Sequence, residues 1–211
     1  MIVKICGVSN PENLRQVARL DADWIGLNFY PPSPRYLNLR ALPPAGSSEP
    51  KRVGVFVDEM PQTILSRIVA FHLDIVQLHG CERAVMIQNL RRSVVPDIRE
   101  KLVVVKAISV ATAADFRQCE EYEGVADYLL FDTKGALHGG NGEKFNWDLL
   151  DAYQGKTPFL LSGGIGPDDA DALRAIRHPL FRGVDVNSKF ETAPGVKDID
   201  LLRSFIKRLR A

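Results

Sequence analysis

The most constraining feature of this sequence is the regular return of short apolar runs, each followed by a segment with helical spacing. These runs are rich in β-branched residues, and they begin roughly every 20–30 residues, the spacing of one βα unit in a barrel. We predict eight strands, at residues 1–7, 22–29, 52–57, 74–78, 102–108, 128–131, 157–161 and 183–186.

Helix signals stand between these runs. Asn10-Pro11-Glu12 offers a capping side chain, a proline at the first helical position and an acid near the positive end. Gly166-Pro167-Asp168 is a similar start, and Thr112 with Asp115 resembles a capping box. The last helix carries Leu202, Phe205, Ile206 and Leu209 on one face.

Strands that alternate with helices are typical of parallel βα units. We therefore predict an α/β fold, a single (β/α)8 TIM barrel that occupies residues 1–211 as one catalytic domain. The competing fold is an open, doubly wound sheet, which needs a topological switch point and usually has fewer strands. Its GxGxxG fingerprint does not follow the first strand.

The charge composition limits the classes of binding partner that we expect. The chain has 27 basic and 26 acidic side chains, so neither a nucleic acid nor an anionic membrane is favoured as a partner. No signal peptide and no apolar run of membrane-spanning length is seen. We expect a small-molecule substrate and a monomer or weak homodimer.

Three cysteines without a CxxC pair argue against a disulfide framework and favour a reducing, cytoplasmic setting. The four histidines lack the HExxH spacing, so we predict that no metal is bound.

In a barrel, catalytic residues lie at the carboxyl ends of the strands. Cys6 ends the first strand and Asp132 follows the sixth, so a thiol and a carboxyl group with separate acid and base roles are expected to face each other. The alternatives are that Cys6 is a small buried hydrophobe and that Asp132 is a helix cap or turn residue.

The seventh and eighth strands are followed by small polar residues. Ser162, Gly163 and Gly164 come after the seventh, and Asn187 and Ser188 after the eighth. Backbone N–H groups at this place form the usual phosphate site of such barrels, and glycine lets the backbone approach the anion. We predict phosphate binding there, with a sugar phosphate as the substrate class.

A proline-rich stretch from 31 to 50 is too irregular for a long helix, so it is either a binding loop or a flexible insert.

Several short motifs, in order along most of the chain, resemble the phosphoribosylanthranilate isomerase family of tryptophan biosynthesis. They are Lys4-Ile5-Cys6-Gly7, Ser33-Pro34-Arg35-Tyr36, Val53-Gly54-Val55-Phe56-Val57, Val76-Gln77-Leu78-His79-Gly80, Phe131-Asp132-Thr133, Gly139-Gly140-Asn141-Gly142, Ser162-Gly163-Gly164, Gly183-Val184-Asp185-Val186-Asn187-Ser188 and Pro194-Gly195-Val196-Lys197-Asp198.

The resemblance implies an Amadori rearrangement of N-(5′-phosphoribosyl)anthranilate, without a cofactor. It implies that Asp132 is the general acid that opens the sugar ring and that Cys6 is the general base that removes the C2′ proton. It also implies that Arg35 holds the anthranilate carboxylate, for which the planar guanidinium is suited.

Other polar residues have two interpretations each. His79 either orients a neighbour or touches the substrate, or is a structural histidine, and Asp185 either organises the eighth loop or positions the substrate. Lys4 lies two residues before Cys6, on the same side of the strand, and either favours its thiolate or pairs with an acid inside the barrel.

The sequence departs from the family pattern at Asn28, where an apolar residue is common, and at Glu143, which displaces the usual lysine to Lys144. Two alternatives to the isomerase remain: another ribose-phosphate isomerase or synthase barrel, and an inactive phosphate-binding barrel that serves as a regulatory subunit.

Overall fold

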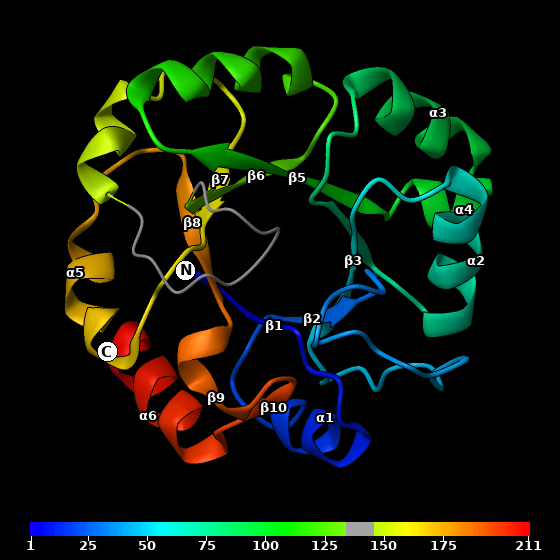
Figure 1. Cartoon of the computed structure of the whole chain (residues 1–211), viewed down its shortest axis with the longest axis horizontal. Coiled ribbons are helices and arrows are strands. Elements are labelled where there is room, and N and C mark those ends of the chain that lie inside the picture. Colours follow the sequence, from blue (N-terminus) through cyan, green and yellow to red (C-terminus); the bar gives the residue numbers. More distant parts are fainter. Residues whose placement is uncertain (134–145) are drawn as a thin grey trace.

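The computed structural model describes residues 1–133 and 146–211, and it confirms the predicted barrel. Eight parallel strands pair in sequence order and close when the last pairs with the first, with the helices in a ring around them (Figure 1). The strands are β1 (Ile2–Cys6), β2 (Trp24–Asn28), β3 (Lys51–Phe56), β4 (Ile75–Leu78), β5 (Val103–Val110), β6 (Tyr128–Thr133), β7 (Phe159–Leu161) and β8 (Phe181–Val186). The Gly139–Gly142 motif and the Glu143–Lys144 departure lie outside the described residues.

Each predicted strand is confirmed within a few residues of its expected ends. β2 begins only at Trp24, because the preceding Asp23 turns back to β1, where its carboxylate accepts a hydrogen bond from the Val3 amide. β6 runs on through Asp132, which is in register with Ser109 of the longer β5. Asp132 is therefore held by the barrel wall itself, a more rigid position than a loop.

The three helical segments with predicted start signals, at Pro11, Ala113 and Pro167, begin at those signals. The helical segments are α1 (Pro11–Val17), α2 (Pro61–Phe71), α3 (Ala84–Ser93), α4 (Pro96–Arg99), η1 (Ala113–Tyr122), η2 (Trp147–Ala152), η3 (Pro167–Asp169), α5 (Ala170–Ala175), η4 (Ser188–Phe190) and α6 (Ile199–Arg210), the η segments being 3₁₀ helices. Asn10 caps α1 by accepting a bond from the Asn13 amide, and the four apolar residues of α6 are buried. No helix of the described ranges is long and apolar enough to cross a membrane.

Three features were not predicted. They are the short helix α4, the 3₁₀ segment η4, and an antiparallel hairpin of β9 (Glu191–Ala193) and β10 (Val196–Lys197), which follows β8. The hairpin strands are only three and two residues long, so they carry no period-2 pattern that a sequence could reveal. Gly195, at a φ of +84°, forms the turn.

The stretch from 31 to 50 divides in two. From Leu37 onward it packs on the barrel: Leu37 is fully buried, the Leu42 amide donates to the Ala70 carbonyl, and Arg67 donates to the Leu39 carbonyl. Its first part stays at the strand ends, where Tyr36 makes an isolated bridge with Asn28. The binding-loop interpretation therefore applies only to the first part.

The barrel has an inner and an outer core. The outer core fills the space between strands and helices, and the inner one is a smaller cluster of strand residues. The inner cluster comprises Cys6, Trp24, Val53, Val55, Ile75, Val105, Ala107, Leu130 and Leu160. Cys6 thus stands at the point where the apolar interior meets the open end.

Candidate active site

A cavity at the carboxyl ends of the strands brings together nine of the ten predicted site residues. Its lining includes Cys6, His79, Asp132, Ser162, Gly163, Gly164, Asp185, Asn187 and Ser188, together with Asn28, Tyr30, Val55, Val57, Gln77 and Ile165. The predicted acid, base and phosphate residues therefore share one site. Within the described chain, Arg35 stands beside this lining and is not part of it.

The Cys6 thiol fits against the neighbouring strand because that strand has a glycine opposite it. Cys6 is in register with Gly26 of β2, and a Cβ atom at Gly26 would lie 2.7 Å from Cys6 Sγ. Cys6 is 6% exposed. Burial raises the pKa of the thiol and Asp185 raises it further, while Lys4 and Lys197 act in the opposite direction. In the free protein Cys6 is therefore a thiol.

Lys4 crosses the barrel interior and makes both of the contacts that the sequence left open. Its Nζ lies 2.7 Å from Asp185 Oδ2, 3.3 Å from Cys6 Sγ and 2.6 Å from Gln77 Oε1. The pair with Asp185 follows from the closing register, in which the two residues are partners. Burial by itself lowers the pKa of Lys4, but Asp185 and Cys6 more than compensate, so the pKa is raised and the ammonium stays charged.

Asp132 has a neighbour at each carboxyl oxygen. Oδ1 accepts a hydrogen bond from the Thr133 amide, and Oδ2 lies 3.3 Å from His79 Nε2. On its other side, His79 Nδ1 lies 3.0 Å from Gln77 Nε2. His79 is therefore placed to orient Asp132, one of the two roles considered for it.

The loop after β7 has two glycines in the left-handed conformation, and the loop after β8 is held by a lysine. Gly163 and Gly164 have φ values of +82° and +65°, and a side chain at Gly163 would collide with Thr133 and Asp132. The Asn187 side-chain oxygen accepts a hydrogen bond from Lys197 Nζ at 2.7 Å. The glycine loop thus packs directly against the end of β6, next to the predicted acid.

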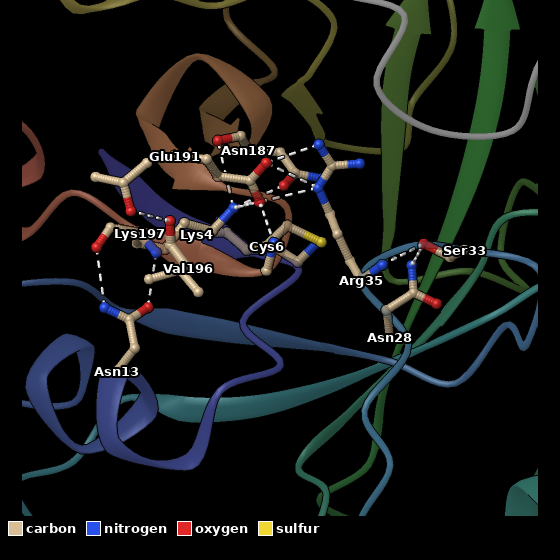
Figure 2. Close-up of polar contacts among 12 residues, drawn as sticks. Lys4, Cys6, Asn13, Asn28, Ser33, Arg35, Asn187, Glu191, Val196 and Lys197 are labelled. Carbon is tan, nitrogen blue, oxygen red and sulfur yellow. Dashed lines mark hydrogen bonds and ion pairs between the residues drawn. The ribbon is translucent and has the colours of Figure 1, made fainter.

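A second ion-pair cluster fixes Arg35 at the edge of this site (Figure 2). Arg35 Nε and Nη2 bind the carboxylate of Glu191, with the Nη2 to Oε2 distance at 2.7 Å. Lys197 Nζ donates to the same carboxylate at 2.7 Å and also bonds to Asn187. Arg35 Nη1 makes no hydrogen bond with the described residues, so one edge of the guanidinium is available for a ligand.

Comparison with known proteins shows the family of this chain. A family model described as N-(5′-phosphoribosyl)anthranilate (PRA) isomerase matches residues 3–208. The chain belongs to this family. Among its relatives, the N-(5′-phosphoribosyl)anthranilate isomerase of Parabacteroides distasonis is 43% identical over 213 residues, covering 99% of this chain and 93% of the relative. Membership makes this chain an isomerase of tryptophan biosynthesis, as the motifs predicted.

Solved structures of the family have the same fold. The phosphoribosyl anthranilate isomerase of Thermus thermophilus superimposes with a TM-score of 0.81 at 28% identity, covering 100% of this chain and 98% of the other. A second member, solved with reduced 1-(o-carboxyphenylamino)-1-deoxyribulose 5-phosphate, gives a TM-score of 0.75 at 33% identity, covering 100% of this chain and 99% of the other.

Four residues of the site were not singled out from the sequence. Asn28 holds the first part of the 31–50 stretch, accepting a bond from the Tyr30 amide and donating to Ser33 Oγ. Glu191 and Lys197 fix Arg35 and Asn187, and Gln77 links Lys4 to His79. Of these, Asn28 carried a signal as a polar residue in an apolar strand position that departs from the family pattern. Gln77 and Lys197 stand in the motifs that carry the resemblance, but no role was predicted for them.

Glu191 gives a prediction for stability against pH. Burial alone would raise the pKa of this carboxyl, but hydrogen bonds and charge from Arg35 and Lys197 outweigh burial, so the pKa is lowered. A lowered pKa contributes stability above the unfolded value of about 4.3, and this stability is lost as the pH falls through the folded value. We expect Glu191→Gln to lower Tm at pH 7 and by progressively less below about pH 4.3. An equal loss of Tm at both pH values would contradict this role.

Proposed function

We propose that this chain converts N-(5′-phosphoribosyl)anthranilate into 1-(2-carboxyphenylamino)-1-deoxyribulose 5-phosphate by an Amadori rearrangement, with Asp132 as general acid and Cys6 as general base. The observation that carries the proposal is the single cavity lined by both residues and by the predicted phosphate loops. A family member binds a reduced form of that product, which supports the same ligand class here.

In the proposed reaction the two groups act one after the other. Asp132 donates a proton to the ring oxygen, the bond from C1′ to that oxygen breaks, and the nitrogen lone pair forms a C1′ iminium. Cys6 then takes the C2′ proton, and the electrons of that C–H bond form the C1′=C2′ enolamine, which tautomerises to the C2′ ketone. The iminium is the electron sink, so we propose that no cofactor takes part.

Cys6 must release its thiol proton to solvent before it can act as a base, and two positive charges, one from Lys4 and one from the substrate, favour that release. Lys4 Nζ donates to its sulfur, and the iminium of the opened substrate adds a second positive charge close to the thiol. The Lys4–Cys6 contact supports the interpretation that Lys4 favours the thiolate, in addition to its pairing with Asp185.

The phosphate and the sugar hydroxyls are assigned to the remaining lining residues. We propose that Ser162, Gly163 and Gly164 and, after the neighbouring strand β8, Asn187 and Ser188 bind the phosphate through backbone N–H and side-chain groups. Asp185 Oδ1 is buried and makes no hydrogen bond with any described residue, so it is suited to accept one from a substrate hydroxyl. His79 lines the same cavity beside Asp132, and we propose that it contacts the opened sugar.

Purified protein should consume phosphoribosylanthranilate, which is followed by the loss of its fluorescence. If the chain bound the substrate but left its fluorescence unchanged over time, the alternative of an inactive phosphate-binding barrel would replace the proposal.

Arg35→Ala is expected to act mainly on substrate binding. Removing a charged hydrogen bond to a carboxylate costs about 1.5–3 kcal/mol, which corresponds to a rise in KM of roughly 10–100-fold with a smaller change in kcat. Because the substitution also leaves Glu191 without Arg35 beside the anthranilate carboxylate, Arg35→Ala with Glu191→Gln separates lost attraction from new repulsion. Steady-state kinetics with unchanged KM and kcat/KM would remove Arg35 from this role.

We further propose a cytoplasmic monomer or weak homodimer. Cys6, Cys81 and Cys119 are all free thiols, in keeping with a reducing compartment. The large apolar side chains that the described residues expose are few and singly placed, which favours no extensive subunit interface.

A further inference from the structure

Gln77 lies between Lys4 on β1 and His79, which directly follows β4, and it contacts both side chains. It is 1% exposed, in β4, with its side chain inside the barrel. Its Oε1 accepts from Lys4 Nζ at 2.6 Å, and its Nε2 lies 3.0 Å from His79 Nδ1. His79 Nε2 in turn lies 3.3 Å from Asp132 Oδ2. A continuous row of polar contacts therefore runs from Lys4 to Asp132.

The direction of the hydrogen bonds in this row is fixed by Lys4. An ammonium group has donors and no acceptor, so the Gln77 atom that contacts it must be the amide oxygen. The other amide atom is then the nitrogen, which donates to His79 Nδ1. Since Nδ1 must offer a lone pair to this donor, the proton of the neutral imidazole resides on Nε2, the nitrogen that faces Asp132.

We propose that Gln77 is a positioning residue that, held by Lys4, fixes His79 in the Nε2–H tautomer facing the Asp132 carboxyl group. The benefit concerns the proton that Asp132 delivers. In the opposite tautomer, His79 would present a bare Nε2 to Asp132 and compete with the substrate for that proton. With Nε2 already protonated, His79 cannot accept it, and the proton remains available for the ring oxygen. This step rests on the proposed acid role of Asp132.

The amide at position 77 is the group that this arrangement requires. A carboxylate there would still accept from Lys4, but its second oxygen would need a proton on His79 Nδ1, which reverses the tautomer or creates an imidazolium. A thioether, as in Gln77→Met, would offer His79 no strong donor and leave its tautomer unfixed. Gln77→Glu therefore tests a hydrogen bond to His79 Nδ1 of reversed direction, and Gln77→Met tests the absence of that hydrogen bond.

The direct test is nitrogen NMR of the full chain labelled with ¹⁵N-histidine. The sequence has four histidines, and the His79→Asn variant identifies the signals of residue 79. We expect the wild type at neutral pH to have Nε2 protonated and Nδ1 unprotonated. Gln77→Glu should move the proton to Nδ1 or place protons on both nitrogens, and the exposed control Gln154→Glu should change neither signal. A wild-type His79 protonated at Nδ1, or an unchanged spectrum in folded Gln77→Glu, would overturn the proposal.

Kinetics provides the second readout. We expect Gln77→Glu to lower kcat at least tenfold with KM nearly unchanged, since a histidine in the wrong tautomer affects the proton transfer more than binding. If Gln77→Glu does not fold, Gln77→Met serves in its place. It should show a mixture of His79 tautomers and a smaller loss of kcat than the loss expected for Gln77→Glu. If the chain proves inactive on phosphoribosylanthranilate while the spectra are as expected, the proposed function fails and the tautomer assignment stands. If the chain is active on phosphoribosylanthranilate but the spectra differ from those expected, only the role of Gln77 is lost and the proposed function stands.

Discussion

Replacing Asp132 by asparagine is expected to lower kcat by roughly 10²–10⁴-fold, the range for loss of a general acid. The amide has the shape of the carboxyl group and its oxygen can still accept from the Thr133 amide, but it has no proton to give to the ring oxygen. KM should change far less than kcat, because Asp132 contributes to the transition state for ring opening. Steady-state kinetics on the fluorescent substrate measures both constants.

Two controls make this result specific. Asp200→Asn makes the same chemical change on α6, where the side chain is 91% exposed, and it should leave kcat unchanged. Circular dichroism should show that Asp132→Asn folds, since only one polar contact at the barrel rim is altered. A folded Asp132→Asn enzyme that keeps kcat within about threefold would assign the proton donor to another group.

Cys6→Ala is expected to cause a loss of similar size, about 10²–10⁴-fold in kcat, because it removes the group that we propose as the base for the C2′ proton. Cys6→Ser should be nearly as inactive, since a serine hydroxyl in contact with Lys4 remains protonated where a thiol can ionise. These variants also leave Lys4 paired with Asp185 and Gln77, so the barrel should stay intact.

The matched control for Cys6 is Cys81→Ser, which changes an exposed thiol next to the β4 end of the barrel and should have no effect on kcat. If Cys6→Ala retained most of the wild-type kcat, Cys6 would be the small buried hydrophobe that its sequence position also allowed.

The barrel fold could be predicted from the sequence because its strands and helices are indicated by local residue patterns. The strands are short runs rich in β-branched residues, and several helices have a start signal of their own, such as Asn10 before Pro11. The hairpin of β9 and β10 escaped prediction because strands this short leave no periodic signature. The type of helix could not be predicted either. Thr112 and Asp115 do form a capping box, but the segment that follows is a 3₁₀ helix.

The site was predictable to the extent that strand ends converge. Cys6, Asp132 and the loop after β7 were found because the fold alone places them at one end of the barrel. Their partners were not, because the pairing of Arg35 with Glu191 joins residues 156 positions apart. Likewise, a role for Gln77 can be inferred only from its contact with Lys4, which crosses the barrel interior. No spacing in the sequence indicates that contact.

The closing pair of strands has a consequence for how the protein becomes active. Lys4 on β1 meets Asp185 on β8 across a separation of 181 residues, so this ion pair forms only after the last strand has been synthesised and has docked. Contacts so remote along the chain form slowly, since the entropy of a very large loop must be lost first. Until β8 docks, Lys4 lacks its partner Asp185, and we therefore expect turnover to recover during refolding only once β8 is in place.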